Sequence, residues 1–399
     1  MYVQMNKVLN EYILSVNCGT SSLKFALFRA DEGMEMELSG EVNGIGSSKS
    51  RCIIHDKDGV ILTDDIIAHP DSGRAVKWLI KWLKANSQKY RVKAIGHRII
   101  QCGVLYKDHQ NVTTQLINKL RPLVSLAPNH LPDELNTLTA FARAFPDIPQ
   151  AACFDTIFHK DMPFYSRYFS LPRAMRKEGL IRYGFHGLSC EYVMQKLKQL
   201  SPREAGGKVL IAHLGNGSSI TAVHKGKSID TTMGLTPTGG LIMGTRSGDF
   251  DPGIVLYLLK EKKMPAGELS MLLNHRSGLK GISGISPDML VLLEKEKTNP
   301  HAKEAIAMYC YSARKFIGSL SASLEGLNCL VFTGGIGENS AAIRSRICNG
   351  LKFLGIKIDN SRNTRHKEVI SSSKSSVTVR VIRTNEALII AKHTFRLTL

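Results

Sequence analysis

Hydrophobic and polar residues follow two different periods along the chain. In residues 22–28 they alternate, which places Leu23, Phe25 and Leu27 on one face of a strand. In residues 75–86 the apolar positions recur at helical spacing and form one stripe, made of Val76, Leu79, Ile80 and Leu83. Further strands are expected at 12–16, 94–100, 151–155 and 329–333, and helices at 251–262, 287–297, 301–326 and from 386. Strands that alternate with helices predict an α/β fold.

Two parts of the chain have similar patterns. Residues 13–33 and 209–229 each contain an apolar strand, a loop of small polar residues, an alternating strand and a turn. Aligning Ser21-Ser22 with Ser218-Ser219 puts the two copies half a chain apart. A duplication would produce two similar domains that face one another, each giving a small-residue loop to a shared cleft. The alternative is that two strand–turn–strand units are alike by chance.

Length and cysteine usage narrow the class of protein. A chain of 399 residues suggests two domains of ordinary size. No apolar run approaches the roughly 18 residues that span a bilayer, and no secretory signal is visible, so no membrane partner is expected. The eight cysteines are scattered singly, which favours reduced thiols over a zinc site or disulfides. The expected location is therefore cytoplasmic.

The charge of the chain is unusual, with 53 basic and 34 acidic residues and a formal net charge of +19. Nucleic-acid binding would need concentrated basic runs with interleaved aromatic residues. The basic residues are instead spread out, and the densest stretch, 362–383, is serine-rich and typical of a solvated loop and a sheet edge. No nucleic-acid partner is expected. The charge is compatible with anionic small substrates.

Three loops have the composition of phosphate-binding loops. Glycine lets the backbone approach a phosphate closely, and hydroxyl and amide groups donate hydrogen bonds to it. Residues 17–22 and 213–219 fit this description, and Lys24 follows the first of them. Residues 334–340 lie between a strand and an expected helix, but they match neither the Walker A nor the dinucleotide pattern. Ordinary hairpin and strand–helix turns use the same residues.

Four polar residues stand in apolar or glycine-rich surroundings. Arg98 interrupts an apolar strand, so it must be paired or face a cleft. Asp155 ends a strand, the usual place for a catalytic group in α/β folds. Arg246 lies in a glycine-rich loop and His186 lies between glycines. Salt bridges or hydrogen-bonded histidines would explain each residue alone, but phosphoryl transfer accounts for all of them together.

The motifs together identify a family resemblance. The chain resembles the acetate kinases, which belong to the superfamily of acetate and sugar kinases, Hsp70 and actin. The matching strings run nearly end to end: GHRII, FDTIFH, RYGFHG, HLGNGSS, GLTPTGGLIMGTRSGD, SGLKGISG, FTGGIGENS and Thr384-Asn385-Glu386. Several of them are specific to acyl kinases.

The resemblance implies reversible, direct in-line transfer of phosphate from ATP to acetate, which gives ADP and acetyl phosphate. It implies Mg²⁺, with Mn²⁺ possible in its place, and usually a homodimer. It also implies two duplicated ribonuclease-H-like, actin-like ATPase domains around a central cleft. The expected domains are 1–155, with helix 386–399 packed back on it, and a nucleotide-binding domain at 156–385.

The resemblance also implies roles for individual residues. Arg98, Asp155, His186 and Arg246 are the expected catalytic residues, and Asn17 and Glu386 the expected metal ligands. The expected acyl site contains Arg98, Ile100, Leu126, Phe185 and Pro237. Nucleotide binding is expected from Lys24, His213, Leu214, Gly215, Asn216, Gly217, Asp288, Met289, Leu290, Gly335, Ile336, Gly337, Glu338 and Asn339.

Alternatives stay open for the substrates. The family commonly has arginine where Leu290 stands, beside the adenine, so the nucleobase preference is open and pyrophosphate is a further donor to consider. Propionate or butyrate could replace acetate, because one methylene changes specificity by only about 1–3 kcal/mol. A different class of function is an actin- or Hsp70-like nucleotide switch without acyl-kinase activity.

Overall fold

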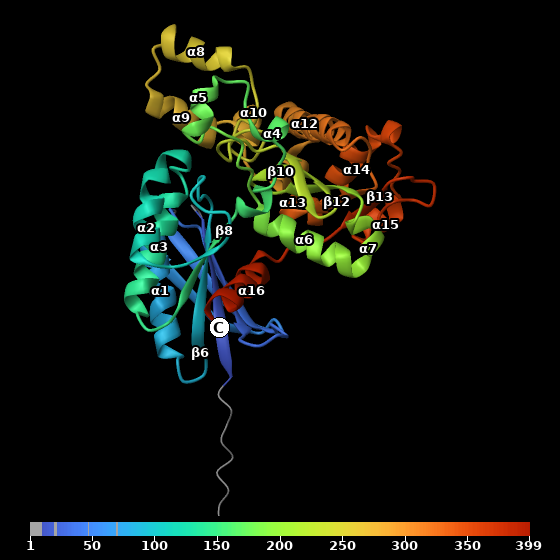
Figure 1. Ribbon diagram of the computed structural model, residues 1–399. Helices are drawn as coiled ribbons and strands as arrows, with labels where there is room; N and C mark the ends of the chain where they lie inside the picture. The colour runs from blue at the N-terminus through green and yellow to red at the C-terminus, as the bar shows by residue number, and fades with distance from the viewer. Residues whose placement is uncertain (1–9, 20–21, 47, 69–70) are drawn as a thin grey trace, which may run out of the picture. The chain divides into compact units, whose positions relative to one another are not determined.

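The computed structural model describes residues 10–19, 22–46, 48–68 and 71–399, and every structural statement below refers to these residues. Thr20 and Ser21 of the first predicted loop lie outside them. The chain forms two compact units: unit 1 contains the N-terminal part to Ile157 and the segment Asn385–Leu399, and unit 2 contains Phe158–Thr384 (Figure 1). Each unit is described by itself.

Unit 1 is built on an eight-stranded sheet with the strand order β5-β4-β3-β2-β1-β6-β8-β7. Its strands are β1 (Glu11–Cys18), β2 (Ser22–Arg29), β3 (Met36–Asn43), β4 (Lys49–Asp56), β5 (Ile61–Ala68), β6 (Arg91–Ile99), β7 (Gln110–Asn111) and β8 (Gln150–Phe154). Its helices are α1 (Ser72–Ala85), α2 (Thr114–Leu120), α3 (Leu131–Ala144) and α16 (Glu386–Thr398), with 3₁₀ turns η1 (Arg121–Leu126) and η2 (Ile157–His159).

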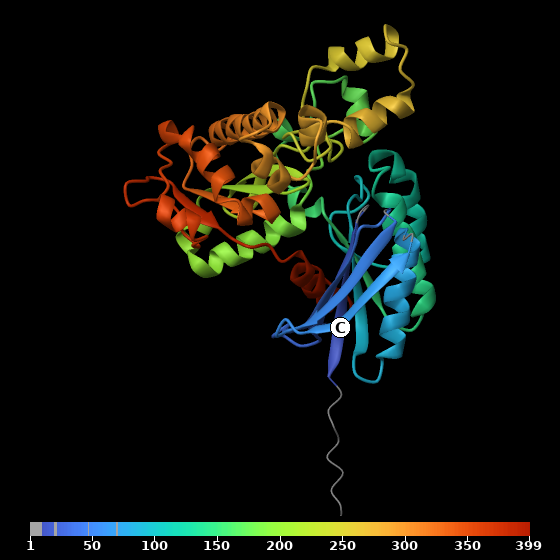
Figure 2. The ribbon, with the colours of Figure 1, turned by 180° about the vertical axis from the view of Figure 1, so that it is seen from behind.

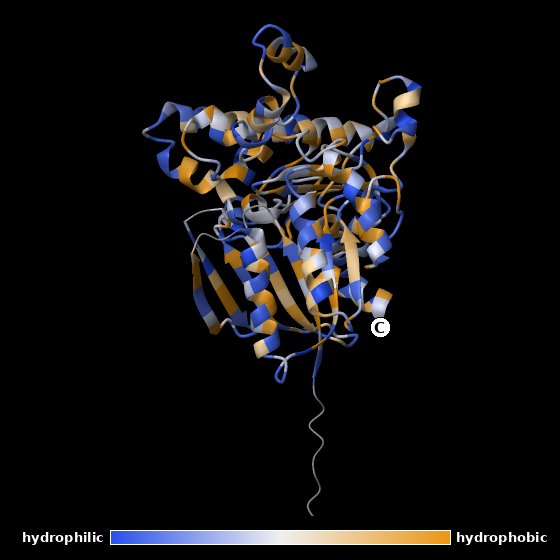
Figure 3. Cartoon of the chain, turned by 90° about the vertical axis from the view of Figure 1, so that its left-hand side faces the viewer, coloured by the Kyte–Doolittle hydropathy of each residue, from blue (hydrophilic) through white to orange (hydrophobic). Residues whose placement is uncertain are grey.

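The two faces of this sheet pack against different helices. Leu23, Phe25 and Leu27 share one hydrophobic core with Leu79 of α1 and Phe141 of α3, as the strand and helix patterns predict. The opposite face of β2 is also apolar and packs with Ala391 of α16. The sheet is therefore buried on both faces near β1 and β2. Figure 3 shows long hydrophobic stretches, in orange, along its strands.

The C-terminal helix α16 lies against β1, β6 and β8, where Figures 1 and 2 show it in red beside the blue strands. Its approach to β6 requires glycine at position 96. A β-carbon on Gly96 would collide with Thr394 Oγ1 and would lie 2.6 Å from Ile390 Cγ2. Helix and sheet are thus in direct contact at a point with no room for a side chain.

Unit 2 contains a five-stranded sheet with the order β11-β10-β9-β12-β13. Its strands are β9 (Lys208–Leu214), β10 (Ser218–His224), β11 (Lys227–Thr231), β12 (Cys329–Thr333) and β13 (Thr378–Val381). Its helices are α4 (Phe164–Arg167), α5 (Arg173–Lys177), α6 (Gly187–Leu200), α7 (Pro202–Ala205), α8 (Pro252–Lys260), α9 (Ala266–His275), α10 (Gly278–Ser283), α11 (Met289–Lys295), α12 (Pro300–Ser323), α13 (Gly334–Asn339), α14 (Ala341–Asn349), the 3₁₀ turn η3 (Lys352–Leu354) and α15 (Asn360–Thr364).

The two sheets share one connectivity. In unit 1 strands β3, β2 and β1 are antiparallel neighbours, and β6 and β8 continue the sheet in parallel with β1. In unit 2 the strands β11, β10, β9, β12 and β13 repeat this arrangement with the same directions. The two similar sequence segments form the equivalent hairpins β1–β2 and β9–β10. The predicted α/β fold with duplicated ribonuclease-H-like domains is confirmed.

Two local predictions need correction. The glycine-rich stretch 334–340 is not a plain turn, because Gly334–Asn339 forms the short helix α13 directly before α14. Residues 362–383 are not only solvated loop and edge: β13 is indeed the edge strand, but Arg380 is largely buried between Glu204 and Glu368. No helix among the described residues has the length and apolar character needed to cross a bilayer.

Replacing Gly96 by alanine is expected to destabilise unit 1 by about 1–3 kcal/mol, because the new methyl group must displace Ile390 or Thr394. Thermal and urea unfolding measure the change. Gly318→Ala is the control: it lies inside α12 with nothing within 4 Å of its β-carbon position, so it should stabilise by up to about 1 kcal/mol. Equal effects of both substitutions would contradict the close packing of α16 on β6.

Candidate functional site

Arg98 and Asp155 form a buried ion pair at the ends of two parallel strands. Arg98 lies near the end of β6 and Asp155 follows β8, and Arg98 Nη2 donates to Asp155 Oδ2 at 2.7 Å. The side chains are 13% and 0% exposed. Burial alone would lower the pKa of Arg98, but the charges of Asp155, Glu386 and Glu134 raise it above its ordinary value. Arg98 therefore stays charged, and it has the partner that its place in an apolar strand led us to expect.

Asn17 and Glu386 lie beside this pair. Arg98 Nη1 donates to Asn17 Oδ1 at 3.4 Å, and Asn17 Nδ2 donates to Glu386 Oε2 at 3.4 Å. Asn17 ends β1 and Glu386 begins α16, so four elements of unit 1 meet here. Lys24 is exposed on β2 and lies opposite Asn17 in the strand register. Amide and carboxylate oxygens are ligands that Mg²⁺ prefers, so this donor set fits that ion.

Glu134 is a buried acid next to the same cluster, and the sequence motifs do not indicate it. Its Oε2 accepts the N–H of Ile100 at 2.8 Å. Its Oε1 and Arg98 Nε have no hydrogen-bond partner among the described residues. Burial raises the pKa of Glu134 to about 8, and the positive charge of Arg98 only partly opposes this. Acidic residues are common in the first turn of a helix, so Glu134 in α3 carries no distinctive sequence signal.

The residues expected in the acyl site divide between the units. Ile100 is buried directly after β6, and Leu126 is half-buried at the end of η1. In unit 2, Phe185 is buried and its carbonyl oxygen is 3.0 Å from His159 Nε2. Pro237 is buried as well, and its carbonyl oxygen accepts a hydrogen bond from Arg246 Nη1 at 3.0 Å.

His186 and His213 stack on each other in unit 2. Their ring centroids are 4.1 Å apart, with 21° between the ring planes. His186 Nδ1 lies 2.9 Å from Ser219 Oγ, and His213 Nδ1 lies 2.8 Å from Ser189 Oγ. His186 has a left-handed backbone, with φ of 58°, where the chain enters α6. Hydroxyl groups thus orient both rings.

Arg246 and His186 both lie close to the loop of the second hairpin. A β-carbon on Gly217 would be 3.4 Å from His186 Nε2 and 3.5 Å from Arg246 Nη1. The loop that carries Arg246 is joined to this hairpin, because Gly244 donates its N–H to the carbonyl of Asn216 at 3.0 Å. Ser218 Oγ and the N–H of Gly215, 3.2 Å apart, close the turn. His213, Leu214, Gly215, Asn216 and Gly217 therefore lie in one group with Arg246 and His186.

Helix α13 contains the third predicted loop, Gly335, Ile336, Gly337, Glu338 and Asn339. The Glu338 carboxylate accepts the N–H groups of Gly334 at 2.9 Å and Thr384 at 3.0 Å. This Glu338 side chain therefore holds the start of α13 to the segment that leads to Glu386. Gly334 has φ of 77°, and a β-carbon there would lie 2.8 Å from the Leu214 carbonyl oxygen, so α13 and the β9 hairpin are in close contact.

The predicted adenine-side residues have mainly structural contacts. Asp288 caps α11 by accepting the N–H of Leu290 at 2.8 Å. Met289 is 3% exposed and belongs to the hydrophobic core, whereas Leu290 is 63% exposed. Asp288 and Leu290 are therefore open to solvent, and Met289 is not.

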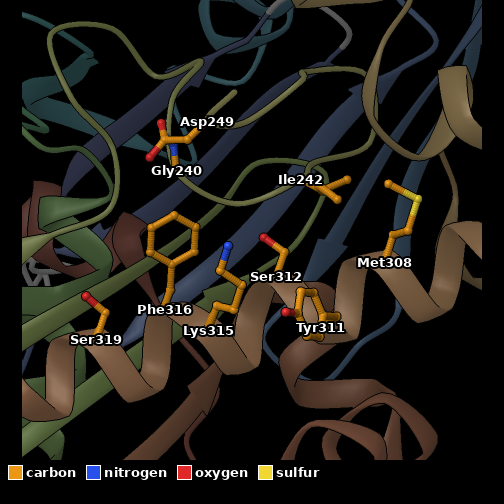
Figure 4. Close-up of a pocket in the computed structure, with 9 residues that line it drawn as sticks. All are labelled: Gly240, Ile242, Asp249, Met308, Tyr311, Ser312, Lys315, Phe316 and Ser319. Carbon is orange, nitrogen blue, oxygen red and sulfur yellow. The ribbon is translucent and has the colours of Figure 1, made fainter. Parts of the chain in front are cut away.

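A cavity of about 480 Å³ lies between one face of α12 and residues 240–249 of the loop that carries Arg246. Figure 4 shows Phe316, Lys315 and Tyr311 rising from α12 toward Gly240 and Asp249. Asp249 Oδ1 accepts the N–H of Gly240 at 2.7 Å and so holds the loop together. Among the described lining residues none is a predicted site residue, so this cavity is separate from the site predicted from the sequence.

The structure thus brings several of the predicted residues together in two groups, each within its own unit, whereas residues 288–290 have mainly structural contacts. One group surrounds Arg98 in unit 1, and the other surrounds Gly217 in unit 2. Three residues next to these groups were missed by sequence reasoning: Glu134, Ser189 and Thr384. Ser189 Oγ donates to Thr384 Oγ1 at 2.9 Å, which extends the contacts of His213. Single serine, threonine and glutamate residues are too common for the sequence to reveal such contacts.

The raised pKa of Glu134 predicts how stability depends on pH. Between its ordinary value of 4.5 and about 8, folded Glu134 holds a proton that the unfolded chain releases. Its contribution is complete below pH 4.5 and is lost as the pH rises to about 8. Glu134→Gln keeps an acceptor for the Ile100 N–H and has no proton to release. It should therefore remove this pH-dependent decrease in the free energy of unfolding, which is on the order of a few kcal/mol. Urea unfolding across this pH range measures it, and parallel pH curves for both proteins would contradict the raised pKa.

Comparisons with known proteins place these observations in a family. Residues 12–392 match the acetokinase family. The acetate kinase of Methylocella silvestris is 40% identical, over 98% of this chain and 98% of its own length. The solved structure of a propionate kinase from Francisella tularensis is 35% identical with a TM-score of 0.90, over 97% of this chain and 100% of that one.

A second solved structure, the acetate kinase of Porphyromonas gingivalis, is 34% identical with a TM-score of 0.85, over 97% of this chain and 99% of that one. Both structures extend over the two units, so the agreement includes the duplicated sheets. The resemblance seen in the motifs is confirmed, and the chain belongs to the acetokinase family.

Proposed function

We propose that this protein is an acetate kinase, which transfers the γ-phosphoryl group of ATP to acetate by direct in-line displacement. The proposal is supported above all by the convergence of His186 Nε2 and Arg246 Nη1 on the glycine of the β9–β10 hairpin. In phosphoryl transfer, negative charge develops on the equatorial oxygens of the transferring group. Donors fixed close to a glycine backbone are suited to stabilise that charge.

The proposed reaction forms one bond and breaks one bond. A carboxylate oxygen of acetate forms a bond to the γ-phosphorus, and the bond from that phosphorus to the β,γ-bridging oxygen breaks. Its electron pair leaves with ADP, and the products are acetyl phosphate and ADP. Acetate is already ionised at neutral pH, so no base needs to deprotonate the nucleophile.

Unit 1 is proposed to bind the acyl substrate. Arg98 is the group proposed to bind the acetate carboxylate. Ile100, Leu126, Phe185 and Pro237 are proposed to line the acyl pocket. Asp155, which is held by Arg98, is proposed to position the substrate rather than act as a general base, because the nucleophile carries no proton. Asn17 and Glu386 would hold Mg²⁺, with Asp155 nearby. When bound, that ion would offset the charge of the ATP phosphates.

Unit 2 is proposed to bind ATP and ADP. The hairpin 213–217 and the helix 335–339 would contact the phosphates. Lys24 is proposed as a further nucleotide-binding residue. Asp288, Met289 and Leu290 would lie near the base. The exposed Leu290 supplies no cation, so the base would be recognised by shape and backbone contacts. The proposed domains are 1–155 with 386–399, and 156–385.

Acetate is proposed as the preferred acyl substrate. A propionate kinase is among the similar solved structures, and one methylene is worth only about 1–3 kcal/mol in an apolar pocket. Turnover of propionate at a lower kcat/KM is therefore part of the proposal. The eight cysteines are all free and buried, which supports a reducing, cytoplasmic location.

Acyl-phosphate formation is the first test. With ATP and Mg²⁺, trapping of the product by hydroxylamine is expected for acetate and more weakly for propionate and butyrate. Arg98→Ala, Arg246→Ala and Asp155→Asn should each lower kcat/KM by at least about a hundredfold, because each removes a charge from the reacting groups. Circular dichroism of each variant checks that it is folded.

Arg51→Ala is the matched control, because Arg51 pairs with Asp64 at an exposed site on β4 and β5. Its kinetics should equal those of the unaltered protein. Absence of product with every acid, using ATP, GTP or pyrophosphate, would refute the kinase proposal. Unaltered rates in the two arginine variants would refute the assigned roles.

A homodimer is also proposed, with α8 in its interface. This helix has no buried residue, and Ile254, Leu256, Tyr257 and Leu259 are 38–54% exposed. Apolar side chains that are exposed together on one helix are typical of protein–protein interaction sites. The second copy would cover these four side chains.

Sedimentation velocity tests the dimer. The unaltered protein is expected to sediment as a dimer at micromolar concentration, and the double variant Leu256→Lys, Tyr257→Lys as a monomer, because two buried charges would oppose association. Ile66→Lys is the control, since Ile66 is 69% exposed on the edge strand β5. A monomeric unaltered protein, or a double variant that remains dimeric, would contradict this interface.

A further inference from the structure

Arg344 is a fully buried arginine of α14, and it lies under the glycine-rich helix α13. Its Nη1 donates to the carbonyl oxygens of Gly337 at 2.8 Å and Glu338 at 2.9 Å. Its Nε donates to Asn363 Oδ1 at 2.8 Å, and its Nη2 contacts the carbonyl of Asn363 at 2.9 Å and His366 Nδ1 at 3.2 Å. Four of the five N–H groups of the guanidinium thus donate to oxygen atoms, and the fifth faces the His366 ring nitrogen.

None of these partners is a carboxylate. Burial lowers the pKa of Arg344 to about 10, so the side chain still carries its charge at neutral pH. A buried charge without a counter-charge is costly, and apolar residues of the same volume would fill a core at a smaller cost. Packing alone therefore does not account for an arginine at this position.

The contacts of Arg344 explain what the side chain does. Glu338 and Gly337 belong to the segment 335–339, and Arg344 holds their carbonyl groups. The Glu338 carboxylate meanwhile holds the N–H groups of Gly334 and Thr384. The short helix α13 is thus fixed at both of its ends by charged side chains, one acting on carbonyl groups and the other on N–H groups. Gly335 between them remains exposed.

We propose that Arg344 is a positioning residue for nucleotide binding, which holds the backbone of residues 335–339 in the conformation that receives the phosphates of ATP or ADP. This inference rests on the proposed nucleotide role of that segment. Arg344 is fully buried beneath α13, so it acts through the carbonyl groups of Gly337 and Glu338 and not by touching the ligand.

The proposal predicts a selective loss of nucleotide affinity. Arg344→Met leaves the two carbonyl groups of α13 without their donor, and its Kd for ADP is expected to rise by about tenfold or more. Arg344→Lys keeps the charge and can replace some of the hydrogen bonds, so its Kd should lie between. Titration calorimetry with Mg²⁺ and ADP measures Kd on the full chain without turnover. The KM for ATP should rise accordingly, while the KM for acetate stays within about twofold.

Arg346→Met is the matched control on the same helix. Arg346 forms a bidentate pair with Glu296 at 2.6 and 2.8 Å, away from α13, so its loss should leave ADP binding unchanged. Hydrogen exchange separates positioning from general stability. In Arg344→Met the amides of residues 334–340 should exchange faster, while those of β9 and β12 keep their protection.

A second variant keeps the test decisive if Arg344→Met fails to fold. His366 is exposed, lies at φ of 50° and contacts both Arg344 and the carbonyl of Glu338. His366→Asn tolerates this backbone conformation and should weaken ADP binding in the same direction but less. Unchanged ADP affinity in a folded Arg344→Met, or in His366→Asn when Arg344→Met does not fold, would overturn the inference. An unaltered protein that binds ADP but makes no acyl phosphate would instead refute the proposed function.

Discussion

The buried ion pair of Arg98 and Asp155 is the contact on which the polar interior of unit 1 depends. Asp155 is fully buried and Arg98 nearly so, so each side chain needs the charge of the other. The pair joins the ends of β6 and β8, and through Asn17 and Glu386 it reaches β1 and α16. Four elements from distant parts of the chain thus meet around the charged side chain of Arg98. The hydrophobic cores on the two faces of the sheet hold these elements in place.

Arg98 and Arg344 show two ways of keeping a cation inside a fold. Arg98 is neutralised by a carboxylate, and the negative charges around it raise its pKa. Arg344 is surrounded by neutral acceptors, four oxygens and one ring nitrogen, and burial lowers its pKa. Arg98 lies together with several acidic side chains, whereas Arg344 binds the backbone carbonyl groups that surround it.

Much of the fold could be predicted, because the spacing of apolar residues and the local composition indicate strands, helices and turns directly. The alternation in 22–28, the stripe of α1 and the similar hairpins at 13–33 and 209–229 depend on residues close in the chain, and all of them are found. The helical state of Gly334–Asn339 was missed because glycine disfavours helices, while Glu338 and Arg344 stabilise this one through contacts with other segments. The sequence likewise required a partner for Arg98, which is Asp155, but it could not reveal Glu134, because Glu134 binds the N–H of Ile100, 34 positions away in the chain.

The return of α16 to unit 1 has a consequence for the order in which the protein forms on the ribosome. Unit 2 is one continuous segment, Phe158–Thr384, and it is synthesised before residues 385–399. Unit 1 begins first but is completed last, because residues 385–399 cover a face of its sheet. Until release, β1, β6 and β8 keep an uncovered apolar surface, which is where a chaperone would bind. Unit 1, although its synthesis begins first, thus cannot reach its final structure before α16 has been made.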